Sequence, residues 1–64
     1  MLGDYLKKAR LRKNLSQTQF AKLLGTSQSY YSRLEKSRVK PGLQMVSKIA
    51  LALNVEESFI RSLL

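Results

Sequence analysis

The 64-residue chain contains no cysteine, no histidine and no tryptophan, and only four acidic residues stand against twelve Lys and Arg. Without thiols or imidazoles it cannot form disulfides, a zinc site with such ligands, or a catalytic site built on Cys or His. The acids are Asp4, Glu35, Glu56 and Glu57, too few and too scattered for a carboxylate active site. We therefore expect a protein that is not an enzyme, with no metal ion, no cofactor and no small-molecule substrate.

Long apolar segments are also absent. No run approaches the ~20 apolar residues that span a bilayer. The N-terminal sequence MLGDYLKKAR carries charge where a signal peptide needs its apolar stretch. We expect a single domain over residues 1–64 that acts in the cytoplasm without a membrane partner. Its small core must rely on helix packing, to which a partner subunit would add.

The charge of the chain is one-sided, at +8. Residues 1–13 carry +4 and residues 33–40 carry +3, whereas residues 41–64 sum to zero. A positive field on part of a small domain favours a polyanionic partner: DNA, RNA or an anionic membrane surface. The sequence shows no aromatic platform on which the bases of a single strand could stack, which argues against an RNA partner. Its basic residues share no face with an apolar wedge, which argues against a membrane surface.

The spacing of apolar residues predicts helices and no strands. We expect an all-α fold with helices over about 2–13, 17–24, 28–36, 43–53 and 55–64. The apolar face of the fourth helix is expected to consist of Leu43, Val46, Ile49, Ala50 and Leu53. In the second helix, Phe20, Ala21 and one of Leu23 and Leu24 are expected to be buried.

Residues at the ends of these helices support their ranges. Ser16 and Gln19 have the S-x-x-Q spacing of a capping box, and Ser27 is a good N-cap for the third helix. Gly25 and Asn54 suit the left-handed conformation in which helices often end.

Three successive segments resemble the Cro/repressor-type helix-turn-helix family, also called XRE-type or lambda-repressor-like. They are S-Q-x-x-F-A-x-x-L-G at 16–25, S-Q-S-Y-Y-S-R-L-E at 27–35 and P-G-L-Q-M-V-S-K-I-A-L-A-L-N-V at 41–55. The resemblance implies a five-helix DNA-binding domain, with the helix-turn-helix at about 17–36 and the third helix in the major groove.

The chain departs from this family at three positions. Ser37 and Asn54 stand where glycine is usual, and Tyr31 stands where a smaller aliphatic residue is usual. We expect Tyr31 to alter the packing of the local core. The conformation of the loop at 37–40 is left open by the sequence.

The outward surface of the third helix carries the residues that we expect to contact base edges. They are Gln28, Ser29, Ser32 and Arg33. Gln can pair with adenine N6 and N7 and Arg with guanine O6 and N7, whereas Ser is permissive. The alternative is an ordinary solvated helix surface; the resemblance favours base contact for Gln28, Ser29 and Arg33.

Contacts with DNA phosphates are expected around this helix, from Gln17, Ser27, Tyr30, Lys36, Arg38 and Lys40. Gln17 begins the second helix, where free backbone N–H groups attract an anion, and the resemblance implies that it also supports the third helix. Arg38 and Lys40 lie in the basic loop after the third helix. For these residues a solvated side chain is the alternative, and for Tyr30 it is half-buried packing.

The resemblance also implies a structural ion pair between Arg10 on the first helix and Glu35 at the end of the third. This pair would tie the recognition helix to the first helix. Breaking a buried pair costs more than the pair itself contributes, because an uncompensated charge remains.

We further expect a homodimer on a palindromic operator, because one recognition helix contacts only a few base pairs. The neutral C-terminal region would supply the dimer contact, through Leu51, Phe59, Leu63 and Leu64. The alternative is that Phe59 closes the core and that Leu51 is a lone surface leucine.

We therefore expect a bacterial or phage transcriptional regulator that binds double-stranded DNA sequence-specifically, with repression as the leading expectation. The same module would serve a DNA-binding antitoxin or a controller of a restriction system, and no feature of the sequence separates these roles. A basic RNA- or membrane-binding domain is the more distant alternative. The apolar end at Ser62-Leu63-Leu64 suggests that a longer protein continues beyond it.

Overall fold

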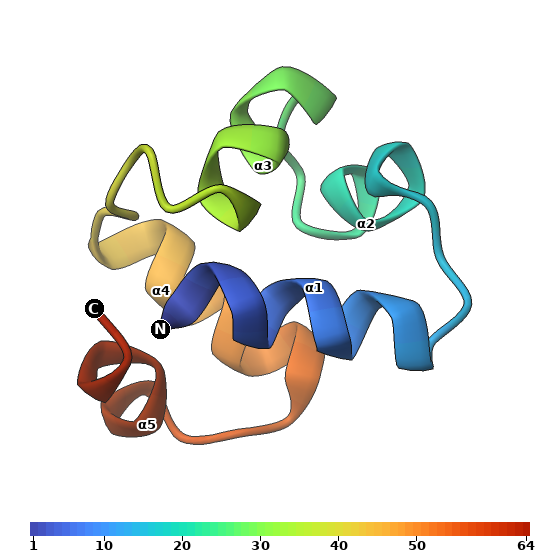
Figure 1. Cartoon of the computed structure of the whole chain (residues 1–64). Helices are drawn as coiled ribbons and strands as arrows, with labels where there is room; N and C mark the ends of the chain where they lie inside the picture. The colour runs from blue at the N-terminus through green and yellow to red at the C-terminus, as the bar shows by residue number, and fades with distance from the viewer.

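The computed structural model describes residues 1–64 and consists of helices without strands (Figure 1). The helices are α1 (Leu2–Arg12), α2 (Gln17–Leu23), α3 (Gln28–Glu35), α4 (Leu43–Leu53) and α5 (Glu57–Ser62). The expected all-α, five-helix fold is confirmed. The last helix is shorter than the expected 55–64, because Glu56 is its N-cap residue and Leu63 its C-cap residue. No helix has the length and apolar character needed to cross a membrane.

Four successive helices end in the Schellman motif, in which the chain leaves the helix through a left-handed residue. The left-handed residues are Asn14, Gly25, Ser37 and Asn54, with φ of 58°, 69°, 57° and 56°. After α3, the N–H of Ser37 donates to the carbonyl of Leu34 at 3.1 Å. The N–H of Arg38 donates to the carbonyl of Arg33 at 2.9 Å. The loop after α3 thus keeps the turn that glycine would provide, with a serine in its place.

The N-terminal caps of α2 and α3 follow the sequence signals. Ser16 Oγ accepts from the backbone N–H of Gln19 at 3.0 Å, and Gln19 Oε1 accepts from that of Ser16 at 2.8 Å. Ser27 Oγ accepts from the N–H of Tyr30 at 3.1 Å. Both N-caps that the sequence predicts are therefore confirmed, and they fix where the two helices of the helix-turn-helix begin.

Every helix contributes to one core. Fully buried side chains come from α1 to α5 in turn: Leu6, Phe20, Tyr31, Ile49 and Ile60. The rings of Phe20 and Tyr31 meet edge to face, with centroids 5.3 Å apart and planes at 86°. This contact joins α2 to α3 in the middle of the domain.

Two leucines at the ends of helices, Leu23 and Leu43, are exposed. Of the Leu23–Leu24 pair, Leu24 is buried and Leu23 is exposed. The expectation that Leu43 belongs to the apolar face of α4 is wrong, because its side chain is 79% exposed. Leu43 is the first residue of α4, and a helical side chain leans toward the N-terminus. It therefore points past the end of the core that Val46 and Ile49 enter.

The arrangement places α3 at one side of the domain and α5 at the other (Figure 1). Between them runs α1, with its N-terminus beside the C-terminal end of the chain (Figure 1). The N–H of Leu2 donates to the carbonyl of Leu63 at 3.1 Å, which closes the start of α1 onto the end of α5. The outer face of α3 is left uncovered by the other helices.

Candidate nucleic-acid interface

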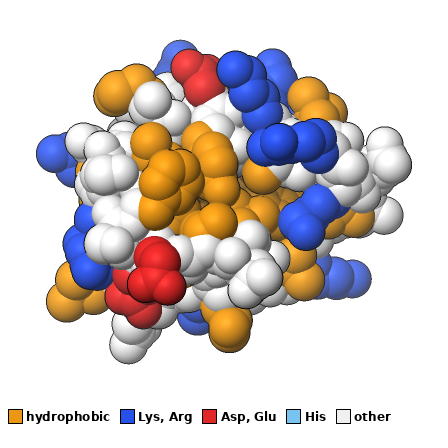
Figure 2. All heavy atoms as spheres, turned by 90° about the horizontal axis from the view of Figure 1, so that it is seen from below, with side chains coloured by type: hydrophobic (Ala, Val, Ile, Leu, Met, Phe, Trp, Pro, Cys, Tyr) orange, Lys and Arg blue, Asp and Glu red, His pale blue; other side chains and the backbone are white.

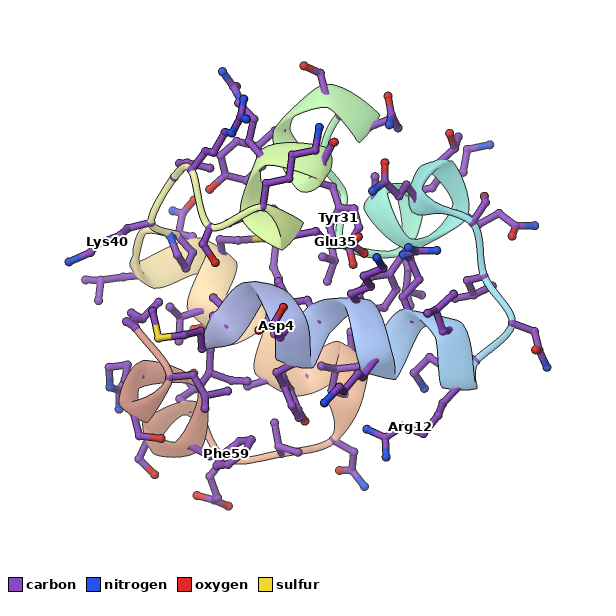
Figure 3. The ribbon with its side chains drawn as sticks, viewed as in Figure 1. Asp4, Arg12, Tyr31, Glu35, Lys40 and Phe59 are labelled. Carbon is purple, nitrogen blue, oxygen red and sulfur yellow. The ribbon has the colours of Figure 1, made fainter.

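The outer face of α3 presents three of the four residues expected to contact bases. Gln28, Ser29 and Arg33 are exposed, and Ser32 is half-buried. The buried residues of the helix, Tyr31 and Leu34, lie on its inner face. The side chains of α3 on its outer side project away from α1 (Figure 3), so this surface is open to a large partner.

The inner end of α3 is fixed by a buried carboxylate. Glu35 and Tyr31 lie between α3 and α1 (Figure 3). Arg10 Nε donates to Glu35 Oε2 at 2.5 Å and its Nη2 donates to Oε1 at 3.3 Å. The two side chains are only 10% and 4% exposed. A further bond, from Arg10 Nη1 to the carbonyl of Leu15 at 3.0 Å, holds the guanidinium against the α1–α2 loop.

Two more side chains donate to the same carboxylate. The hydroxyl of Tyr31 donates to Glu35 Oε2 at 2.5 Å, and Gln17 Nε2 donates to Oε1 at 3.1 Å. Gln17 Oε1 in turn accepts from Gln28 Nε2 at 2.9 Å. A continuous chain of hydrogen bonds thus runs from the core to an expected base-contacting residue.

The environment of this carboxylate keeps it ionised. Burial alone would raise the pKa of Glu35, but the hydrogen bonds from Arg10, Tyr31 and Gln17 together outweigh burial and lower it. The hydrogen bond to Glu35 raises the pKa of Arg10, against the opposite effect of burial. Burial, and then the bond to Glu35, raise the pKa of Tyr31. The phenol therefore stays protonated and acts as a donor.

Sequence analysis missed the bonds of Tyr31 and Gln17 to Glu35. Tyr31 and Glu35 are four residues apart on one helix, the spacing at which side chains meet, so this bond had a signal. The approach of Gln17 to Glu35 joins two helices, and its one signal was the support of the third helix that the resemblance implies for Gln17. The bonds of Gln17 to Glu35 and Gln28 agree with its expected support of the third helix, and its contact with a phosphate stays a prediction.

The residues expected to contact phosphates differ in how exposed they are. Lys36, Arg38 and Lys40 are exposed, and Lys40 lies at the outer side of the loop between α3 and α4 (Figure 3). Ser27 Oγ caps α3, and its hydroxyl hydrogen remains available to an anion. Tyr30 is half-buried against the core. Not all of the basic excess lies here, since Arg12 points away from α3 (Figure 3).

The three leucines and the phenylalanine expected at a dimer contact lie on different parts of the surface. Leu51 is 85% exposed and lines a shallow hollow with Leu23 and Leu24. Leu63 and Leu64 line another hollow, with Val39 and Pro41 among its walls.

Phe59 packs edge to face on Tyr5, with ring centroids 5.3 Å apart, and it is still partly exposed. Figure 2 shows the side of the molecule opposite α3, where hydrophobic side chains gather in the middle of the face and charged ones surround them. The structure therefore offers two separate apolar places, one around Leu51 and one at the end of the chain.

Comparisons with known proteins agree with this geometry. Residues 6–60 match the sequence model of the helix-turn-helix family. The chain is 37% identical, over 60 residues, to the ImmF control region 10 kDa protein of Bacillus phage phi105. It is 33% identical, over 60 residues, to the SPbeta prophage-derived uncharacterized HTH-type transcriptional regulator YonR of Bacillus subtilis (strain 168). Each alignment covers 94% of this chain, but 67% of the first relative and 56% of the second.

Proposed function

The chain belongs to the helix-turn-helix family of DNA-binding transcriptional regulators, and from this membership we propose that it is a sequence-specific repressor of bacterial or phage genes. The names of its relatives, a phage control region protein and a prophage-derived regulator, support this setting. The observation that carries the proposal is the open outer face of α3, where Gln28 is exposed and anchored by Gln17. The protein acts where the bacterial DNA is, in the cytoplasm.

In this proposal α3 enters the major groove and its side chains contact base edges. Gln28 and Arg33 have the functional groups for bidentate pairing with adenine and guanine, and Ser29 and Ser32 lie beside them. Lys36, Arg38 and Lys40 neutralise phosphates on the flanking backbone. Affinity should then fall steeply with salt, with a slope of log K against log[salt] of about −0.9 per neutralised phosphate.

The experiment is selection of bound sequences from random duplex DNA. We expect a short motif with two-fold symmetry, its half-sites about 34 Å apart, because two copies of α3 would occupy successive major grooves. Arg33→Ala should lose about 1–3 kcal/mol on the selected duplex and relax one position in each half-site. Failure to select any motif would reject sequence-specific binding.

Matched arginine variants separate phosphate contact from net charge. Arg38→Ala should weaken binding to the selected duplex and to a scrambled duplex alike, and should reduce the salt slope by about 1. Arg12→Ala removes the same charge on the side of the molecule away from α3 and should change both affinities much less. If Arg38→Ala and Arg12→Ala weakened binding equally, the phosphate contact would not lie at Arg38.

We also propose that the protein binds its operator as a homodimer through the neutral C-terminal region. Two apolar places are available for the contact, Leu51 on one side and Leu63 with Leu64 on the other, and Phe59 adds apolar surface. Leu63→Lys and Leu51→Lys therefore test them separately, by sedimentation with and without the palindromic duplex. Whichever of the two substitutions lies at the dimer contact should lower the cooperativity of DNA binding. A ratio of one protein per palindrome at saturation would reject the dimer.

A further inference from the structure

The hydroxyl of Tyr31 is a polar group inside the core that the contacts with DNA proposed above do not use. Tyr31 is fully buried, and its ring already packs on Phe20. A phenylalanine would provide the same ring contact without a polar atom. The hydroxyl must therefore be explained by its bond to Glu35.

The carboxylate of Glu35 is fully occupied. Its Oε2 accepts from Arg10 Nε and from the hydroxyl of Tyr31, and its Oε1 accepts from Arg10 Nη2 and from Gln17 Nε2. A carboxylate offers about four lone-pair sites, so these four donors use its capacity. Because it is ionised, the carboxylate has no hydrogen to donate.

This occupancy gives the chain of amides a direction. An acceptor-only carboxylate requires the amino end of Gln17, so the carbonyl end of Gln17 faces Gln28. Gln28 must then turn its own amino group toward Gln17. Its Oε1 and its second N–H stay free, and these are the acceptor and the donor that adenine N6 and N7 require.

The hydroxyl matters because the end of a glutamate side chain rotates easily about its last torsion angle. Without it, Oε2 would keep a single donor, Arg10 Nε, and the Glu35 side chain is only 4% exposed. The carboxylate would then rotate to share its remaining donors, and the bond to Gln17 Nε2 would lengthen or break.

We propose that Tyr31 is a positioning residue for base recognition, whose hydroxyl fixes the Glu35 carboxylate and, through Gln17, the direction of the Gln28 amide. The proposal rests on the proposed function of the α3 surface. Tyr31 itself is buried and does not contact DNA.

The test compares Tyr31→Phe with a matched control, Tyr5→Phe. Tyr5 also packs edge to face on a phenylalanine, but it lies outside the network of Glu35. The probes are the duplex selected from random DNA and a scrambled duplex of the same composition. Tyr31→Phe should weaken binding to the selected duplex about tenfold, within the range that one bidentate base contact contributes to discrimination. Binding to the scrambled duplex should change less than about twofold, and Tyr5→Phe should change neither.

Two further measurements separate positioning from a general loss of structure. In a Gln28→Ala background, Tyr31→Phe should cause no additional loss on the selected duplex, because the residue that it positions is gone. In the free protein, the side-chain amide NMR signals of Gln17 and Gln28 should shift in Tyr31→Phe and not in Tyr5→Phe.

The outcomes distinguish this inference from the function on which it rests. Wild-type protein that binds both duplexes equally would reject sequence-specific binding, and the NMR comparison, which needs no DNA, would still decide whether Tyr31 positions the amides. Unchanged amide signals in Tyr31→Phe would overturn the positioning role. An equal loss with and without Gln28 would overturn it as well, because the effect would then come from the fold.

Discussion

Removing one partner of the Arg10–Glu35 pair should cost a large part of the stability of this domain. Arg10→Met keeps most of the side-chain length but removes the charge and three hydrogen bonds, two to Glu35 and one to the Leu15 carbonyl. A buried charge left without its partner costs about 3–5 kcal/mol. At roughly 0.05–0.15 kcal/mol per residue, a domain of this size has about 3–10 kcal/mol in total.

The assay is urea unfolding followed by circular dichroism at neutral pH. Arg61→Met is the matched control, because Arg61 pairs with Glu57 at 3.3 Å with both side chains about half exposed. Such surface pairs contribute about 0–1 kcal/mol. We expect Arg10→Met to unfold at a much lower urea concentration than the wild type and Arg61→Met to resemble the wild type. A cost below about 1 kcal/mol for Arg10→Met would refute the description of Glu35 as a buried charge that needs its partner.

Two other predictions concern the same end of α3. Gly3→Ala should destabilise the domain by about 1–3 kcal/mol in thermal unfolding, since a Cβ at Gly3 would lie 2.3 Å from the carbonyl oxygen of Glu35, a backbone atom that cannot turn aside. Gly42→Ala, where a Cβ meets nothing within 4 Å, is the control. The lowered pKa of Glu35 stabilises the folded state above the pKa of the unfolded chain, and this stabilisation is lost as pH falls through the folded value, below 4.5. A carboxyl NMR titration of Glu35 with a midpoint above 4.5 would contradict this sign.

Helix positions could be predicted from the sequence because their signals are local. Ser16, Ser27, Gly25 and Asn54 each act within one turn of their own helix, and the structure confirms all four. Ser37 shows the limit of such rules, because serine takes the left-handed conformation when the surrounding bonds require it.

Burial was harder to predict where a helix reaches the edge of the core. Periodicity alone assigns Leu43 to the apolar face of α4, but it does not say where the core ends along the helix axis. In the same way it could not choose between Leu23 and Leu24. Leu51 is exposed as expected, because its position is opposite to the buried residues of α4.

The hydrogen-bond network could be predicted only in part. The approach of α2 to the end of α3 brings Gln17 to Glu35, and this depends on how three helices pack rather than on any spacing in the chain. The Arg10–Glu35 pair also joins two helices, and it was expected from the resemblance rather than from spacing. The residues of the candidate site could thus be proposed one by one from the sequence, whereas the bonds that order them required the structure.

The buried network also predicts a separation between stability and specificity. Replacing a buried ion pair by apolar residues of similar volume is often neutral or stabilises a protein by about 1–4 kcal/mol. Arg10→Met, Glu35→Leu and Tyr31→Phe together remove both charges and the hydroxyl, so no buried charge is left unpaired. We expect this triple variant to unfold at the same or a higher urea concentration than the wild type.

The triple variant should nevertheless discriminate poorly between the selected and the scrambled duplex. Gln17 loses its acceptor on Glu35, so neither end of its amide is preferred, and Gln28 is no longer turned in one direction. The triple variant should therefore keep or gain stability in urea while it loses discrimination between the two duplexes. A triple variant that is stable and discriminates as well as the wild type would show that the network serves folding alone. One that unfolds easily would show that the polar groups stabilise this core more than apolar packing can.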